Sequence, residues 1–156
     1  MTADVRLETR EAQHAVSLHF DCAPEAMGPN LERILPMILE YALSKGGDVV
    51  GPPFLRYHAL MDNRFYLEAG IPLASPVEGT TEIRSTELPG GEVAVATHIG
   101  PYREIGTTHK KVRDWIRQNE LETASASWDS YLDDPGEVEP AKVRTQVIYP
   151  VASDAG

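Results

Sequence analysis

Two short segments in the C-terminal half of the sequence combine residue types that can bind an aromatic or cationic ligand. The segment WDSY supplies Trp128, Asp129 and Tyr131, and the segment THIGPYREI supplies His98 and Tyr102. Aromatic rings attract cations through their faces. An unpaired carboxylate is costly to bury, which favours a functional role for Asp129. Packing in the core remains the alternative for Trp128, Tyr102 and His98. If WDSY is a strand, Asp129 and Tyr131 share one face and Trp128 lies on the other.

An internal repeat organises the elements that must position these residues. The segment DVRLE recurs as EIRST after 78 positions, Pro24 recurs as Pro101 after 77, and Pro72 recurs as Pro150 after 78. Agreement of three markers within one residue indicates a duplicated unit. We therefore predict one domain over residues 1–156, made of two repeats at roughly 4–75 and 82–153, with no DNA-binding domain.

Each repeat has the pattern of strands around one helix. AVSLHF alternates as a strand does, and LPGGE is a turn signal. Apolar residues recur at helical spacing from Leu31 to Ala42 and from Tyr102 to Ile116. Pro36 should kink the first helix or shift its start. A strand–helix–strand–strand unit used twice predicts an α+β fold, with an antiparallel sheet, both helices on one face and a ligand cleft between the halves.

The repeat also pairs two polar residues. At an offset of 78 positions Glu68 coincides with Gln146, each on the last strand of its half. Equivalent strands of related halves approach each other at a seam, where pockets form readily. We therefore expect Tyr57, Glu68 and Gln146 to line one cavity together with Tyr102, Trp128, Asp129 and Tyr131.

The charge and hydrophobicity of the sequence restrict the kinds of molecule that the protein can bind. The formal net charge of −10 disfavours direct nucleic-acid binding, which needs clustered Lys and Arg. Solubility explains this acidity, and a field that attracts cationic partners is the alternative. The first residues contain no signal-peptide pattern, and the apolar run ILPMILEYAL is too short to cross a bilayer. These observations predict a cytoplasmic protein that does not interact with membranes.

No cofactor or metal site is expected from the motifs. The single Cys22 excludes a disulfide framework within the chain, and GGDVVGPP matches neither a phosphate loop nor a dinucleotide fingerprint. Four of the histidines show no metal-ligand spacing with partners, namely His14, His19, His58 and His109.

Several segments together carry a family resemblance. LPGGEVAVATHIGPYREI and WDSYLDDPGEVEPAKVRTQVIYPV, with GPPFLRYH and EAGIPL in the first half, resemble the GyrI-like family. This family is also called the AraC-type or bacterial transcription-activator effector-binding domain. The resemblance implies two strand–helix–strand–strand repeats around a cleft that binds small, often cationic or aromatic, molecules, as in multidrug-type effector domains. No helix-turn-helix can be fitted before Val5 or after Val151, so we expect a stand-alone member.

The sequence departs from the family pattern at both carboxylate positions. The pattern Trp-Glu-x-Tyr of relatives corresponds to Trp128 to Tyr131, with Asp129 in place of Glu. The pattern Thr-Glu-Ile corresponds to Thr145 to Val147, with Gln146 in place of Glu. The hydrolytic activity of some relatives is thereby put in doubt, because a general base needs the right reach and pKa.

Three functional classes follow. The leading one is a small-molecule-binding protein for aromatic or cationic amphipathic ligands, related to transcription-regulator effector domains. It would be either a sensor that acts through a partner such as a regulator, or a protein that sequesters such compounds. The second is a hydrolase of small electrophilic compounds, with Tyr131 or Tyr102 assisting Asp129 and Glu68. The third is a modulator of a nucleic-acid enzyme, such as the topoisomerase gyrase, through direct protein contact.

Overall fold

The computed structural model describes residues 4–134 and 136–153. The chain forms two compact units. Unit 1 comprises Met1–Glu11 and Gly90–Gly156, and unit 2 comprises Ala12–Pro89. Each unit contains antiparallel strands and one long helix, so the predicted α+β class is confirmed.

Unit 2 has four strands in the order β3-β4-β2-β5. Their bounds are Gln13–Cys22 for β2, Phe54–Met61 for β3, Arg64–Pro72 for β4 and Ile83–Leu88 for β5. A two-residue turn joins β3 to β4, and both of its residues, Asp62 and Asn63, have positive φ. Asn and Asp tolerate this conformation, which suits a tight hairpin.

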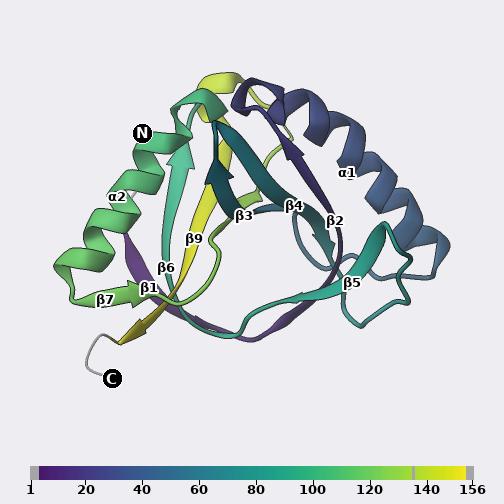
Figure 1. Cartoon of the computed structure of the whole chain (residues 1–156), viewed down its shortest axis with the longest axis horizontal. Helices are drawn as coiled ribbons and strands as arrows, with labels where there is room; N and C mark the ends of the chain where they lie inside the picture. Colours follow the sequence, from purple (N-terminus) through teal and green to yellow (C-terminus); the bar gives the residue numbers. More distant parts are fainter. Residues whose placement is uncertain (1–3, 135, 154–156) are drawn as a thin grey trace. The chain divides into compact units, whose positions relative to one another are not determined.

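The helix of unit 2 is α1, Met27–Ser44, which follows a short 3₁₀ turn at Pro24–Ala26. Its fully buried residues Ile34, Ile38 and Ala42 recur at helical spacing, and α1 packs against β2 and β4 (Figure 1). Pro36 lies inside the helix, which begins nine residues earlier, so the proline does not set the start of α1.

Unit 1 has the strand order β1-β6-β9-β8, with β7 also paired to β9. The bounds are Arg6–Arg10 for β1, Gly91–Ile99 for β6, Leu121–Thr123 for β7, Trp128–Tyr131 for β8 and Arg144–Ser153 for β9. The helix α2, Ile105–Gln118, follows a 3₁₀ turn at Tyr102–Glu104 and lies along β6 and β9 (Figure 1). A further 3₁₀ turn, Pro140–Lys142, precedes β9.

The first strand of each sequence repeat pairs with the second strand of the other repeat. Strand β1, which opens the first repeat, pairs with β6, and β5, which opens the second, pairs with β2. This reciprocal exchange is why the units divide at residues 11 and 89 rather than between the repeats.

Each sheet has a face that packs its helix, which we call the helix face, and an opposite face, which we call the far face. In unit 1 the helix face is fixed by a buried cluster that joins α2 to the sheet. It contains Ala94, Ala96, Val112, Ile116, Val147, Tyr149 and Val151. In unit 2, Leu73 Cδ2 approaches Gly47 at the end of α1, so the helix face carries Leu73 and, by alternation along β4, Leu67, Ala69 and Ile71. Neither helix in the described part of the chain is long and apolar enough to cross a bilayer.

Candidate functional site

Glu68 is a buried carboxylate on the far face of unit 2. It lies on β4 between two neighbouring strands, opposite His19 of β2 on one side and Arg56 of β3 on the other. Only 1% of Glu68 is exposed. A carboxylate is rarely buried to this extent unless it is paired, so its partners determine what the site can bind.

Three side chains donate hydrogen bonds to Glu68. Arg56 contacts both carboxylate oxygens, from Nε to Oε1 at 2.8 Å and from Nη2 to Oε2 at 3.0 Å. Ser17 Oγ donates to Oε2 at 2.6 Å, and His58 Nε2 donates to Oε1 at 2.8 Å. The carboxylate is therefore held at both oxygens, and the bidentate arginine fixes its orientation.

The same contacts determine the charge of Glu68. Burial raises the pKa of this carboxyl, but the hydrogen bonds from Arg56, Ser17 and His58 and the charge of Arg56 outweigh burial and lower the pKa to about 2. Glu68 is thus ionised throughout the physiological pH range. Arg56 compensates this negative charge.

His58 reaches Glu68 because β3 contains a bulge. The register of β3 against β4 shifts between Tyr57 and Ala59, which leaves His58 as the extra residue. Its ring stacks on that of His19, with centroids 5.2 Å apart and planes at 22°. The side chains of His58 and His19 are 37% and 51% exposed, so they connect buried Glu68 to solvent.

A small cavity lies beside these histidines. Its volume is about 180 Å³, and its lining residues are His19, Phe20, Asp21, His58, Tyr66 and Leu67. Burial lowers the pKa of His19, the nearby Glu68 raises it, and the charges of His58, Arg84 and Arg56 lower it further. The net direction is downward, which keeps the His19 ring neutral at neutral pH and able to accept a hydrogen bond or bind a metal.

Tyr57, the other predicted site residue of unit 2, lies on the opposite face from Glu68. It pairs with Leu67 and makes an edge contact with Phe65, with ring centroids 5.9 Å apart. The structure therefore does not bring Tyr57 and Glu68 together, although both belong to the β3–β4 hairpin.

In unit 1, Asp129 belongs to a buried hydrogen-bond network on the helix face. His109 Nε2 donates to Asp129 Oδ1 at 2.8 Å, and His109 Nδ1 lies 2.7 Å from the Tyr149 hydroxyl. Arg113 Nη1 donates to the same hydroxyl at 3.1 Å. Burial raises the pKa of Tyr149 more than Arg113 lowers it, so the phenol stays protonated and can donate to His109. This network ties β8 and β9 to α2.

His98, Tyr102 and Tyr131 surround the beginning of α2. His98 Nε2 donates to the carbonyl of Pro101 at 3.0 Å, and Nδ1 lies 2.7 Å from Thr108 Oγ1. Gly100, at φ +132°, precedes the turn. Tyr102 meets Tyr131 edge to face, with ring centroids 5.4 Å apart. Both ring nitrogens of His98 have partners in the protein, which assigns this histidine a structural role in the turn.

Gln146 and Trp128 lie on the far face of unit 1. Gln146 pairs with Ser130 of β8, and its Oε1 accepts a hydrogen bond from Arg10 Nη2 at 3.1 Å. Trp128 pairs with Ile148 and is 3% exposed. Strand alternation places Asp129 on the opposite face from both. Seven of the eight predicted residues lie on strands and fall on two faces in each unit, with Glu68, Gln146 and Trp128 on far faces. Tyr102 lies in the 3₁₀ turn before α2. The predicted cleft between the halves stays a prediction.

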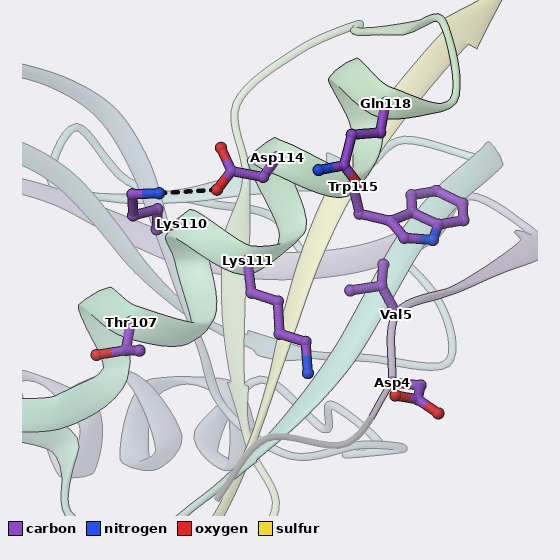
Figure 2. Close-up of a pocket in the computed structure, with 8 residues that line it drawn as sticks. All are labelled: Asp4, Val5, Thr107, Lys110, Lys111, Asp114, Trp115 and Gln118. Carbon is purple, nitrogen blue, oxygen red and sulfur yellow. Dashed lines mark hydrogen bonds and ion pairs between the residues drawn. The ribbon is translucent and has the colours of Figure 1, made fainter.

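A second hollow, of about 650 Å³, lies in unit 1 between α2 and the segment just before β1 (Figure 2). Figure 2 shows Trp115 and Val5 at one end and Lys111 directed into the hollow, while Lys110 is paired with Asp114 at 2.8 Å. Its charges are mixed and exposed, and no buried polar group of the predicted site lines it.

The sequence reasoning missed Arg56, Ser17, His19 and His58. They come from two strands and contact Glu68 from both sides, so no spacing within one segment reveals them. The strand pairing around β4 was the signal that could have found them, because His19 and Arg56 are the residues directly opposite Glu68.

Comparison with known proteins identifies the fold. Residues 3–152 match the family model of the GyrI-like small molecule binding domain. The C-terminal domain of EcmrR is similar, with a TM-score of 0.85 and 17% identity over 96% of this chain and 98% of that domain. The same match to EcmrR in its complex with DNA covers 57% of the longer chain.

Two other solved structures share the fold. SAV2435 bound to tetraphenylphosphonium has a TM-score of 0.67 and 14% identity over 96% of this chain and 94% of that one. A hydrolase from Listeria innocua has a TM-score of 0.68 and 16% identity over 95% of this chain and 91% of that one. No curated protein matches the chain. With a family model that covers residues 3–152, the chain belongs to the GyrI-like small-molecule-binding family.

Proposed function

We infer that this chain binds amphipathic aromatic ligands on the far face of unit 2, and that it prefers cationic ligands over neutral ones of the same shape. The observation that carries this inference is Glu68, an ionised carboxylate that is 1% exposed and whose neighbours His19 and His58 line a cavity. A core that needed only stability would have an apolar residue at this position on β4.

The hydrogen-bond partners of Glu68 have two different roles. Arg56, whose side chain is 11% exposed, and Ser17 hold the carboxylate in place. His58 is more exposed and contributes a single hydrogen bond. A ligand cation can therefore replace His58 at Oε1 while Arg56 and Ser17 keep the carboxylate oriented.

Aromatic surface is available next to this position. The stacked rings of His19 and His58 and the ring of Tyr66 border the cavity. Such rings bury the apolar part of a ligand, and the tyrosine face adds about 0.5–2 kcal/mol for a cation. Arg56 already neutralises much of the charge of Glu68, so we expect only a modest preference for a cationic ligand. A difference of about tenfold in affinity corresponds to the lower end of the range for a charge-assisted contact.

The relatives support the same class of ligand. SAV2435 was solved with tetraphenylphosphonium, an aromatic cation, and EcmrR was solved on DNA. By this likeness, the chain would serve as the sensor part of a regulatory system, reporting the ligand to a DNA-binding partner. These roles belong to the proposal and rest on fold similarity at 14–17% identity.

Calorimetry with a matched pair of dyes, one cationic and one neutral, tests the proposal. The wild type should bind the cationic dye about tenfold more tightly, and Glu68→Gln should abolish that difference while the neutral dye binds as before. Asp129→Asn is the matched control, because Asp129 lies on the helix face of the other unit. Equal affinity of the wild type for both dyes, or a loss of preference in the Asp129 variant alone, contradicts the proposal.

A further inference from the structure

Three metal-ligating side chains meet on the far face of unit 2. His19, His58 and Glu68 each present one ligand atom, and these atoms lie within 4.8 Å of one another. The residues come from β2, β3 and β4, which are adjacent in the sheet, with β4 in the middle. His19 faces Glu68 directly in the register, and the bulge in β3 brings His58 to the other side.

The distances are close to those of a metal centre. His58 Nε2 lies 2.8 Å and His19 Nε2 lies 3.7 Å from Glu68 Oε1. In a tetrahedral zinc site with bonds of about 2.0–2.2 Å, neighbouring ligand atoms are about 3.3–3.5 Å apart. To reach this spacing His58 would move away from Oε1 by about 0.5–0.7 Å and His19 would move toward it by about 0.2–0.4 Å, which half-exposed histidines can do.

The surroundings already hold the carboxylate in the way that metal sites require. Ser17 Oγ and Arg56 Nη2 donate to Oε2, which leaves Oε1 directed at the two histidines. Such outer partners fix the ligand orientation and set metal affinity. Arg56 Nε also donates to Oε1 at 2.8 Å, so a metal would take the position of the His58 proton rather than that of the arginine. The positive charge of Arg56 lowers the affinity for any cation.

We propose that His19, His58 and Glu68 form a binding site for a zinc-like divalent metal ion with one coordination position open to the adjacent cavity. Two imidazoles and one carboxylate suit zinc and its neighbours, whereas magnesium prefers oxygen ligands and water. Three protein ligands with a free fourth position are typical of centres where water or another molecule completes the coordination. This site differs from the dye site in its ligand and does not depend on the proposed function.

Isothermal titration calorimetry of the chelator-treated protein with zinc sulfate tests the site. The wild type should bind one zinc ion per chain and show no comparable heat with magnesium. His58→Ala and His19→Ala should each weaken zinc binding by more than about a hundredfold, because even an outer partner contributes about 10–100-fold. His14→Ala is the matched control, since His14 is a partly exposed histidine on the same strand, and its zinc affinity should equal that of the wild type.

Two further measurements keep the test independent of folding. Cobalt bound to the wild type should give the intense visible absorption of a tetrahedral centre. In the same wild-type protein, zinc should shift the NMR ring signals of His19 and His58 and leave those of His14 and His98 in place. Absence of saturable one-to-one binding, or equal zinc affinity in the wild type and both histidine variants, overturns the proposal. A protein that binds zinc but not the dyes leaves this inference standing and refutes the proposed function alone.

Discussion

The guanidinium of Arg56 and the carboxylate of Glu68 face each other across neighbouring strands β3 and β4, with two hydrogen bonds of 2.8 and 3.0 Å. This buried pair explains how β4 can carry an ionised carboxylate among buried apolar residues. It also means that Glu68 offers a ligand an oriented acceptor rather than an isolated charge, which is why the expected preference for cations is modest.

The pair should show strong coupling in a double-mutant cycle. Arg56→Met alone should destabilise the protein by about 3–5 kcal/mol, because it leaves the buried carboxylate without its main partner. The double variant Arg56→Met with Glu68→Leu should lose much less, since no uncompensated charge remains. Urea unfolding of the four proteins measures the coupling free energy. Additive losses would show that the two residues act independently.

Acid should remove the stabilisation that Glu68 provides. The folded pKa of about 2 lies below the ordinary value of 4.5, so the contribution is complete above about pH 5 and is lost as the pH falls toward 2. The difference in pKa corresponds to roughly 3 kcal/mol. Unfolding free energies from pH 7 down to 3 should fall more steeply for the wild type than for Glu68→Gln. Parallel curves would contradict this assignment.

The hydrogen-bond network of Asp129 should contribute to stability and not to the preference for cationic over neutral ligands. Asp129→Asn disturbs the hydrogen bond with His109 Nε2 and should cost about 1–3 kcal/mol in the free energy of unfolding. His109→Ala in the same background should add little, because the two residues share one network. Thermal unfolding gives the stability, and unchanged dye affinities complete the test. A reduced affinity for the cationic dye alone would place Asp129 in the ligand site.

Gly70 should tolerate no side chain. A Cβ there would lie 2.4 Å from Phe54 Cζ and 2.8 Å from the carbonyl oxygen of Val16, and Phe54 is fully buried. Gly70→Ala should therefore destabilise the protein by about 1–3 kcal/mol. Gly28→Ala is the control, because a Cβ at Gly28 in the first turn of α1 meets nothing within 4 Å. It should be neutral or stabilise by up to about 1 kcal/mol. Equal effects of the two substitutions would contradict the close approach at Gly70.

Much of the fold could be predicted because it depends on local patterns. Alternation in AVSLHF and helical spacing from Leu31 to Ala42 correspond to β2 and α1, and strand alternation correctly separated Trp128 from Asp129. The exchange of β1 and β5 between the repeats could not be predicted, because each strand has an acceptable partner in either repeat.

The site was harder to predict, and Tyr57 shows the reason. A regular hairpin closed by Asp62 and Asn63 would place Tyr57 opposite Glu68 and on the same face of the sheet. The bulge shifts the register by one residue, so Arg56 takes that position and Tyr57 turns to the helix face. Neither the bulge nor the partners that it selects has a clear signature in the sequence. The polar position itself, Glu68, was identified because the repeat marked it together with Gln146.

A crystal structure of the protein soaked with tetraphenylphosphonium tests the central claim most directly. We expect the cation on the far face of unit 2, in contact with Glu68 and the ring of Tyr66, with His58 displaced from Oε1 and the hydrogen bonds from Arg56 and Ser17 retained. A cation bound elsewhere, with the hydrogen bond from His58 to Glu68 unchanged, would contradict the account.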